Sequence, residues 1–381
     1  MILLTSDFHL GYGYNTEREK DCYFVLDEIL KEQIDLILFA GDMFESRVPR
    51  LEVLAEAMSF LIKLKEKNSN AKFIECDKKI NERALQGIPF ISIYGNHERR
   101  PNLINPIQTL ERAGLLINLH CQKIIFEIGN RKVAIHGMSH VPERYARDVL
   151  FEWNPKPVVG AINILLMHQN IEPFVYSPLE NANLTLSDLP EGFDYIVNGH
   201  IHWKNVVDLS RGKLIIPGST VITQLNKKEA EIKKGYFLLN EELKFKEIKQ
   251  RKFYYNSLEN KEELENFLES LGTEELKPII KIKIKNTSPI DLNILEKKYK
   301  DKGILIFQKE IETKFEKHRS EIVAKQLTAE EYGQKLLKEK MKFDKIEDLI
   351  NAILEDDFSG VEKILKENFH NYTKVQKFQS N

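Results

Sequence analysis

The sequence is poor in cysteine and has no long apolar run. Its 381 residues include three cysteines, Cys22, Cys76 and Cys121, an odd number whose spacings match neither a zinc-binding motif nor a disulfide framework. No segment approaches the ~18 apolar residues of a membrane span, and the first residues lack the features of a signal peptide. These absences exclude a disulfide scaffold, and we expect a soluble protein of the reducing cytoplasm with no membrane segment.

Composition and charge set wider limits. Apolar residues make up 42% of the chain and charged residues 30%, which excludes a disordered or collagen-like chain. At roughly 100 to 200 residues per domain, the length predicts two or three domains. Residues 1–200 hold 21 Lys and Arg against 27 Asp and Glu, whereas residues 201–300 hold 20 against 15. The basic segment is compatible with a polyanion-binding module, and equally with an ordinary solvated surface.

The first 235 residues alternate short apolar runs with helical patterns. The runs are short enough to be buried strands and cover residues 2–6, 34–40, 89–94, 132–136, 163–167, 195–198 and 214–216. Residues 51–67 place apolar side chains on one helical face. We therefore predict a layered α/β sandwich. The polar stretch 68–87 is predicted to be an irregular insertion.

Residues 236–314 have a different, lysine-rich pattern. In residues 281–285 isoleucine alternates with lysine, so the isoleucines should face a core and the lysines should face outward. Outward lysines on a strand are typical of edge protection, and a binding surface is the alternative. Ser288-Pro289 is predicted to open a helix that Gly303 closes, before a strand at 304–307. We expect a small separate α+β domain here.

The C-terminal segment is predicted to be helical. A charged linker at 315–326 precedes it, and capping boxes that begin at Thr328 and Ser359 mark two helix starts. Apolar residues recur at helical spacing in both helices, and these apolar helix faces must be buried against another part of a protein. They pack either on the chain's own body or on a partner, and the linker favours a docking module over residues 327–371.

Five polar clusters each follow an apolar run. They are Asp7-Phe8-His9, Gly41-Asp42, Gly95-Asn96-His97-Glu98, His168-Gln169 and Gly199-His200-Ile201-His202. Because ligands of open α/β sheets bind outside the carboxyl ends of the strands, we expect the five loops to converge on one site. A single histidine after a strand is more often structural, but five clusters in this order reverse that judgement.

The candidate ligands are oxygen and nitrogen donors without thiolate. They are Asp7, His9, Asp42, Asn96, His168, His200 and His202. This set favours Mn, Fe or Zn over a structural zinc site of the cysteine type. Seven donors suit two ions about 3.5 to 4 Å apart that share a carboxylate, as in sites that hydrolyse phosphate esters. The remaining histidines are interpreted as structural: His120, His136, His140, His318 and His370.

The order of these motifs resembles that of calcineurin-like metallophosphoesterases over about residues 1–235. Within that superfamily, the chain is similar to the SbcD and Mre-eleven family of DNA double-strand-break repair nucleases. The segments that carry this similarity are Asp7-x-His9-Leu10-Gly11, Gly41-Asp42-Met43-Phe44 and Met167-His168-Gln169. The resemblance implies a four-layer α/β/β/α sandwich at 1–235, a capping, DNA-binding domain at 236–314, a linker at 315–326 and ATPase-binding helices at 327–371.

The resemblance also implies a role for each ligand. One manganese ion would be held by Asp7, His9, Asp42 and His202, and the other by Asp42, Asn96, His168 and His200, so Asp42 would bridge the two. His97 would not bind metal but would contact the phosphate and protonate the leaving 3′ oxygen. Some members of the family carry a histidine directly after Gly-Asp-x-Phe, where this chain has Glu45, so the role of that position is open here.

Three kinds of partner are implied in the same way. They are DNA, as double-stranded ends and single-stranded segments, a coiled-coil ABC-type ATPase of the SbcC or Rad-fifty type, and a second copy of the chain. Helices at 51–67 and 105–113 would form the homodimer through Leu54, Leu61, Ile107 and Leu110, unless these residues pack on their own sheet. The candidates for phosphate contact are Arg99, Lys281, Lys283 and Lys285. In a prokaryote such a protein would lie at the nucleoid.

The implied function is a Mn-dependent DNA exonuclease and single-strand endonuclease that acts at double-strand breaks. Another calcineurin-like phosphodiesterase and an inactive DNA-end tether are the alternatives. A protein Ser/Thr phosphatase is disfavoured, because its second motif reads Gly-Asp-x-x-Asp-Arg-Gly, whereas this chain has Gly41-Asp42-Met43-Phe44-Glu45-Ser46-Arg47.

Overall fold

The computed structural model describes residues 1–175, 182–272, 274–285 and 292–310, together with residues 349, 363, 364 and 366. The chain divides into two units, residues 1–310 and residues 311–381. The predicted linker and ATPase-binding helices therefore lie outside the described residues, apart from the isolated positions just named. Within the described part of the chain, no helix is long and apolar enough to cross a membrane.

The first sheet contains the amino-terminal strand. Its six strands run in the order β15-β14-β1-β2-β4-β5. Four are parallel, namely β1 (Ile2–Thr5), β2 (Leu36–Ala40), β4 (Phe90–Ile93) and β5 (Ile117–Asn118), and two are antiparallel, namely β14 (Gly235–Leu239) and β15 (Leu243–Glu247). Every residue of β1, β2 and β4 is buried, because both faces of the sheet are covered.

The second sheet has seven strands in the order β12-β13-β11-β8-β7-β6-β3. Its parallel centre consists of β13 (Lys213–Ile216), β11 (Tyr195–Asn198), β8 (Ala161–Met167) and β7 (Arg131–Met138). The antiparallel flanking strands are β12 (Asn205–Asp208), β6 (Gln122–Ile128) and β3 (Ala71–Cys76). A separate pair consists of β9 (Ile171–Glu172) and β10 (Leu184–Thr185). The strands predicted from the apolar runs are all present.

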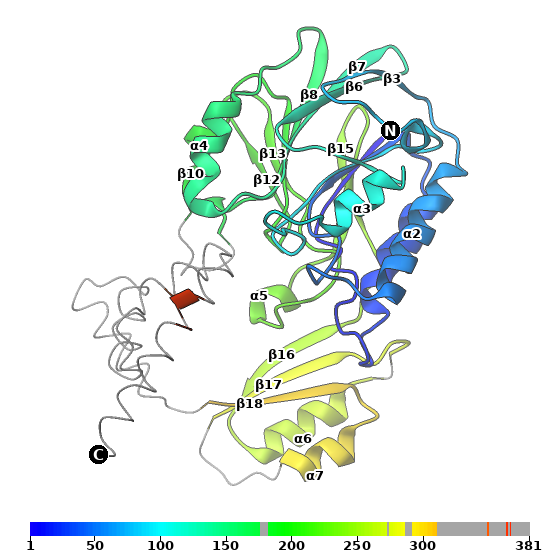
Figure 1. Cartoon of the computed structure of the whole chain (residues 1–381). Coiled ribbons are helices and arrows are strands. Elements are labelled where there is room, and N and C mark those ends of the chain that lie inside the picture. Colours follow the sequence, from blue (N-terminus) through cyan, green and yellow to red (C-terminus); the bar gives the residue numbers. More distant parts are fainter. Residues whose placement is uncertain are drawn as a thin grey trace, which may run out of the picture. The chain divides into compact units, whose positions relative to one another are not determined.

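The two sheets pack face to face between helices, with α4 on one side and α2 on the other (Figure 1). Helices α1 (Phe24–Lys31), α2 (Leu51–Lys65) and α3 (Pro106–Arg112) cover the first sheet, and α4 (Glu143–Trp153) covers the second. The shorter helices are α5 (Lys227–Ala230), η1 (Asp21–Tyr23), η2 (Glu82–Leu85) and η3 (Leu186–Asp188). The predicted four-layer α/β/β/α sandwich is therefore confirmed.

The predicted dimer residues lie mostly inside this sandwich. Leu61 of α2 and Ile107 and Leu110 of α3 are buried in the core between these helices and the first sheet, and Leu54 is half-buried. Three of the four side chains therefore stabilise their own subunit and cannot form an exposed dimer face. The exposed apolar residues in and near these helices are instead Val48, Leu51, Ile62, Leu103 and Ile104.

The prediction of an irregular insertion at 68–87 is wrong. Residues 71–76 form β3, which pairs with β6 at the edge of the second sheet, and η2 follows. The strand was missed because four of its six residues are exposed and the other two are half-buried, so it has no apolar face to give a pattern. β6 was missed as well, although Ile124, Ile125 and Phe126 are buried.

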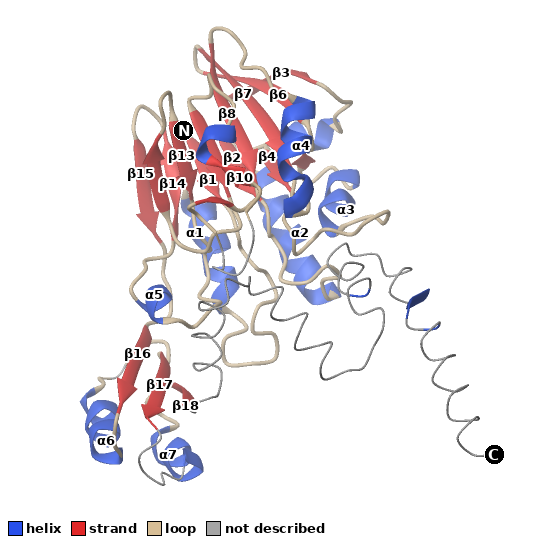
Figure 2. Ribbon diagram, turned by 90° about the vertical axis from the view of Figure 1, so that its left-hand side faces the viewer, coloured by secondary structure: helices blue, strands red, loops and turns tan. Residues whose placement is uncertain are grey.

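A smaller parallel sheet follows the sandwich, with helices α6 and α7 beside it (Figure 2). Its strands are β16 (Phe253–Leu258), β17 (Ile279–Lys285) and β18 (Ile304–Glu310), and its helices are α6 (Lys261–Ser270) and α7 (Leu292–Tyr299). Ile280, Ile282 and Ile284 are buried, as the alternation predicted. Edge protection is the wrong interpretation of the lysines, because β17 lies between β16 and β18.

The junction between the two parts differs from the predicted boundary at residue 235. β14 pairs with β1, and β15 pairs with β14, so residues 236–247 continue the first sheet. A buried ion pair lies at the junction, where the Arg251 guanidinium donates to Asp21 of η1 at 2.8 Å. Ile222, Phe253 and Ile279 form a small apolar cluster beside α5. The role of residues 236–314 as a capping domain stays a prediction.

Candidate metal centre

The five polar clusters follow five strands from the two sheets. Asp7 and His9 follow β1, Asp42 follows β2, and Asn96 and His97 follow β4, whereas His168 follows β8, and His200 and His202 follow β11. Hydrogen bonds join these loops. The Asp7 amide donates to the Gly41 carbonyl at 2.9 Å, and the His200 amide donates to Asp7 Oδ1 at 3.1 Å. Residues 193 positions apart in sequence thus share one site.

The backbone of these loops is strained. Asp7, His9, Asp42 and His200 all have positive φ values, between 48° and 73°. Such conformations cost of order 1–3 kcal/mol each and persist where the surrounding structure imposes them, which is common at functional sites. Gly95 has no room for a side chain, since a Cβ atom there would overlap Asp42 Oδ1. The glycine before Asn96 therefore lets two loops approach each other.

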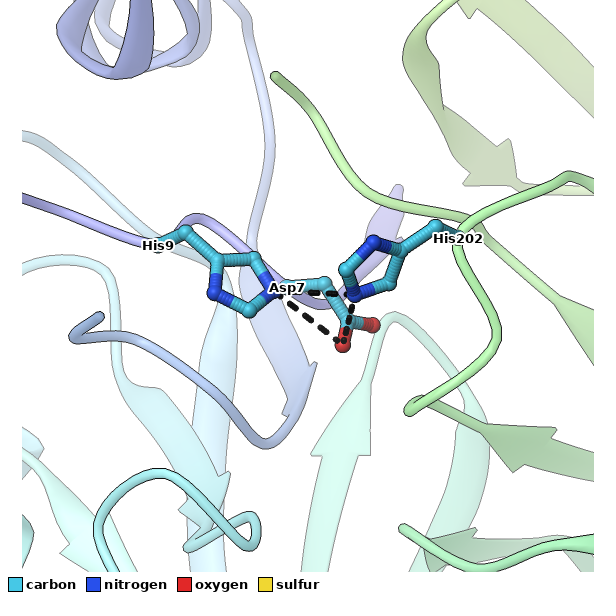
Figure 3. A group of neighbouring side chains, drawn as sticks. All are labelled: Asp7, His9 and His202. Atoms are coloured by element: carbon cyan, nitrogen blue, oxygen red, sulfur yellow. Dashed lines mark hydrogen bonds and ion pairs between the residues drawn. The ribbon is translucent and has the colours of Figure 1, made fainter. Parts of the chain in front are cut away.

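The first cluster consists of Asp7, His9 and His202 (Figure 3). The Nε2 atoms of the two histidines lie 3.0 Å apart, and each lies 3.9 Å from Asp7 Oδ1. All three side chains are buried. Both histidines thus turn their Nε2 atoms toward the Asp7 carboxylate, an arrangement that fits a metal ion bound by all three residues.

The second cluster consists of Asp42, Asn96, His168 and His200. His168 Nε2 lies 3.3 Å from Asp42 Oδ2 and 3.0 Å from Asn96 Oδ1. His200 Nδ1 lies 3.1 Å from the same Asn96 oxygen. Asp42, His168 and His200 each offer a ligand atom within 4.8 Å of the others. Every predicted ligand therefore belongs to one of the two clusters.

The donors fit divalent cations. Asp7 Oδ2 is buried and has no hydrogen-bond partner among the described residues, an arrangement that a bound cation would relieve. His9 Nε2 and His202 Nε2 face each other at 3.0 Å, where two neutral imidazoles can share at most one proton. The set of carboxylate, amide and imidazole donors suits Mn, Fe or Zn.

Hydrogen bonds on the outer side of the rings orient three of the histidines. The carboxylate of Glu45 lies 2.8 Å from His9 Nδ1, the Thr223 hydroxyl lies 2.7 Å from His202 Nδ1, and the Ala40 carbonyl lies 2.7 Å from His168 Nδ1. In each ring Nε2 is left to face its cluster. Such partners fix the tautomer and direction of a metal-binding histidine.

The metal-free clusters titrate differently. Burial lowers the pKa of His168, but the charge and hydrogen bond of Asp42 outweigh it and raise that pKa to about 9. Burial and the neighbouring His9 hold the pKa of His202 well below its usual value. Burial raises the pKa of Asp42, but the charges of His168, His97 and His9 hold it well below its usual range. Asp42 contacts both clusters, since its Oδ2 lies 3.3 Å from His168 Nε2 and its backbone carbonyl accepts the amide of His9 at 3.1 Å.

A model of the family described as "Calcineurin-like phosphoesterase" matches residues 1–204. This range is more than half of the chain and includes both clusters and His97. The chain belongs to the calcineurin-like phosphoesterase family.

Within this family, the chain is similar to DNA double-strand break repair proteins. It is 32% identical over 280 residues to the double-strand break repair protein MRE11 of Encephalitozoon cuniculi, an alignment that covers 66% of this chain and 47% of the relative. The chain is 31% identical over 247 residues to the DNA double-strand break repair protein Mre11 of Sulfurisphaera tokodaii. This alignment covers 61% of this chain and 57% of the relative. The chain is 28% identical over 409 positions to the protein of the same name from Sulfolobus acidocaldarius. This alignment covers 96% of this chain and 97% of the relative.

The chain therefore spans about half the length of the first two relatives and nearly all of the third. These similarities confirm the resemblance to the SbcD and Mre-eleven family that the motifs indicated.

His97 lies beside both clusters of this phosphoesterase domain. Its Nδ1 lies 2.7 Å from the Glu45 carbonyl, and its Nε2 lies 4.0 Å from Asp42 Oδ2. The side chain is 31% exposed, so it can meet a substrate. Burial lowers the pKa of His97, but Asp42, the Glu45 carbonyl and the nearby carboxylates outweigh it and raise that pKa above its usual value. A raised pKa favours the protonated form that a general acid needs.

Glu98 was missed as a functional residue. It is fully buried and accepts hydrogen bonds from three backbone amides, those of Asp42 at 3.2 Å, Phe44 at 2.7 Å and Gly95 at 2.8 Å. It therefore joins the β2 and β4 loops and holds Asp42 in place. Its position inside the Gly-Asn-His-Glu motif was the one signal available in the sequence.

The histidines interpreted as structural keep that interpretation where the structure describes them. His140 Nδ1 lies 3.1 Å from the His168 carbonyl, so it supports the second cluster from outside. Burial and the charges of His168 and His200 lower the pKa of His140 to about 3. His136 packs edge-on against the ring of Phe193. His318 and His370 lie outside the described residues.

The candidate DNA contacts belong to different elements of the fold. Arg99 belongs to the β4 loop and is half-buried, whereas Lys281 and Lys283 are half-buried on β17. Lys281 Nζ lies 6.0 Å from the centre of the Tyr255 ring. The side chain of Lys285 lies outside the described residues. Contact of these residues with phosphate stays a prediction.

Proposed function

We propose that this protein is a nuclease that hydrolyses phosphodiester bonds of DNA at double-strand breaks with two manganese ions. The observation that carries the proposal is the pair of adjacent clusters, each made of nitrogen and oxygen donors, with Asp42 interacting with both. Divalent ions held there would polarise the phosphate and supply the nucleophile for hydrolysis. The repair proteins to which the chain is similar support DNA as the substrate.

The remaining roles belong to residues of the chain. Asp7, His9 and His202 would hold one ion, Asn96, His168 and His200 the other, and Asp42 would bridge them. Because His97 Nδ1 bonds to the Glu45 carbonyl, its Nε2 is the nitrogen directed at the clusters. We assign to this atom the proton that the leaving 3′ oxygen takes up.

The proposal extends to exonuclease and single-strand endonuclease activity and to three partners. We propose that residues 236–314 contact DNA, that residues 327–371 bind a coiled-coil ABC-type ATPase, and that the phosphoesterase domain forms a homodimer. Deletion of residues 327–381 should abolish binding of the ATPase and leave the manganese content unchanged. Retained binding would overturn the proposed role of the tail.

The function is tested by manganese-dependent release of nucleotides from end-labelled duplex DNA, measured beside hydrolysis of a small chromogenic phosphodiester. We expect His97→Asn to lower the turnover of DNA by roughly 10²- to 10⁴-fold, with manganese and DNA binding retained. His120→Asn, which lies outside both clusters, is the matched control and should be fully active.

Each alternative predicts a different result in the same assay. A wild-type protein that cleaves only the small diester is another phosphodiesterase, and one that binds DNA ends without cleaving either substrate is a tether. Full activity of the His97→Asn protein would remove His97 from the chemistry.

A further inference from the structure

Glu45 lies between two imidazoles of the centre. Its Oε2 is 2.8 Å from His9 Nδ1 and its backbone carbonyl is 2.7 Å from His97 Nδ1. The two rings are 4.8 Å apart and meet edge to face. One residue therefore contacts both a proposed metal ligand and the proposed general acid.

The backbone keeps Glu45 in this place. Its amide donates to the Leu10 carbonyl at 3.1 Å, and the Leu10 amide donates to the Met43 carbonyl at 2.8 Å. The loop after β2 is thus hydrogen-bonded alongside the loop that carries His9. The Glu45 side chain is 36% exposed, so its contact with His9 is not forced by burial.

We propose that Glu45 is a positioning residue that fixes the direction and tautomer of His9. A carboxylate can only accept a hydrogen bond, so His9 Nδ1 must carry the proton, and the neutral ring then presents its lone pair at Nε2. That atom faces His202 and Asp7. The inference rests on the proposed function in one respect, namely that His9 binds metal.

A third metal site made of His9, Glu45 and His97 is the competing interpretation, since their ligand atoms also lie within 4.8 Å of one another. It conflicts with the first cluster. A neutral imidazole has one lone pair, so His9 cannot bind an ion through Nδ1 while Nε2 serves the first cluster. His97 Nδ1 is also engaged by the Glu45 carbonyl at 2.7 Å. Two hydrogen bonds, from His9 Nδ1 to the Glu45 carboxylate and from His97 Nδ1 to the Glu45 carbonyl, satisfy all three residues without a metal ion.

The same contact explains how a carboxylate is tolerated beside a phosphate site. Glu45 Oε2 is directed at His9 Nδ1, so its negative charge faces a hydrogen-bond donor of the chain. Among the outer partners identified in the described residues, Glu45 is charged, whereas Thr223 and the Ala40 carbonyl are neutral. Substitution at this position should therefore change the first cluster and leave the second intact.

The test begins with metal-free protein labelled with ¹⁵N-histidine, at a pH of about 8.5, two units above the usual histidine pKa of about 6.5. Two-bond ¹H–¹⁵N spectra report which ring nitrogen carries the proton, and His9→Asn assigns the signal. We expect His9 to be protonated at Nδ1 in the wild type and to become a mixture of tautomers in Glu45→Ala. Glu52→Ala, an exposed glutamate on α2, is the matched control and should leave the spectrum unchanged.

Manganese binding by titration calorimetry gives the second readout. We expect Glu45→Ala to weaken one of the two sites about tenfold to a hundredfold. Glu45→Gln keeps an acceptor oxygen and should lose less. Wild-type tautomer and affinity in Glu45→Ala would overturn the proposal, and an equal loss in both variants would overturn the role of Glu45 as an acceptor. If the wild type binds no manganese, the proposed function fails, while the metal-free spectra still decide the role of Glu45.

Discussion

The two clusters orient their histidines by different means. In the first cluster, the outer nitrogens of His9 and His202 contact side chains, Glu45 and Thr223. In the second cluster, His168 bonds to the carbonyl of Ala40, the last residue of β2. A backbone carbonyl is present whatever residue occupies the position. The orientation of His168 is therefore built into the sheet, whereas the orientations of His9 and His202 can be altered by single substitutions away from the candidate ligands.

The first cluster also depends on a buried ion pair. Lys234 Nζ donates to Glu229 at 2.9 Å and to the His202 carbonyl at 3.0 Å. Glu229 accepts the backbone amide of Thr223 at 3.0 Å. The pair thus holds both His202 and the residue that orients it, and both charged side chains are at least 96% buried. The corresponding second-cluster loops are joined by Glu98 through backbone amides.

Asp42→Asn should affect both clusters alike, because Asp42 interacts with both. We expect manganese stoichiometry to fall below two ions per chain and DNA hydrolysis to fall to background, measured by calorimetry and by release of labelled nucleotides. Asp208→Asn, whose side chain is 81% exposed, is the control and should behave as the wild type. Two ions bound with wild-type affinity would show that Asp42 is not a shared ligand.

Lys234→Met tests whether the first cluster depends on the buried pair. Removal of one partner leaves the Glu229 charge buried and unpaired, so the free energy of unfolding should fall by about 3–5 kcal/mol, measured by urea denaturation. The adjacent substitution Lys233→Met breaks an ion pair between Lys233, whose side chain is 63% exposed, and Glu247, whose side chain is 54% exposed. It should lower the free energy of unfolding by about 0–1 kcal/mol. Equal losses of unfolding free energy in the two variants would show that the buried pair contributes no more than the exposed one.

Proton release should distinguish the clusters. The pKa of His168 is raised from 6.5 to about 9, so its imidazolium must lose a proton when metal binds, whereas His202 is already neutral. Manganese affinity at one site should rise about tenfold per pH unit from about pH 7 to 9. Because the folded pKa is raised, the stabilisation from this proton is complete below pH 6.5, and metal-free protein should lose it as the pH rises from 6.5 through 9.

Calorimetry in buffers of different ionisation enthalpy measures the released proton. His168→Gln removes the titrating group and should make the affinity of the remaining site nearly independent of pH over this range. A wild-type protein that binds both ions at pH 7 without releasing a proton would contradict the raised pKa.

The smallest effect is expected from Thr223→Val, which removes the hydroxyl beside His202 and keeps the shape of the side chain. We expect affinity at one manganese site to fall about tenfold, with a change in unfolding free energy below about 1 kcal/mol. Thr109→Val on the exposed side of α3 is the control for a lost hydroxyl. A loss at both sites would mean that the clusters are not independently supported.

Most of the candidate site could be predicted because each candidate ligand adjoins an apolar run that becomes a strand of the sandwich. Glu45, Thr223 and Lys234 could not be predicted, since each acts on a histidine at least 21 positions away and none belongs to a repeated pattern. β3 was missed because an exposed edge strand needs no apolar face. Leu61, Ile107 and Leu110 carry an amphipathic pattern that an interface and a core produce equally.

Local order along the chain was thus enough to identify the strands that precede the candidate ligands, the candidate ligands themselves and the family, because strand formation and ligand chemistry depend on neighbouring residues. The division into two clusters, the nitrogen that each histidine presents and the burial of the Lys234–Glu229 pair depend on contacts between distant loops. Those contacts exist only after the two sheets have packed, since the packing determines which loops meet.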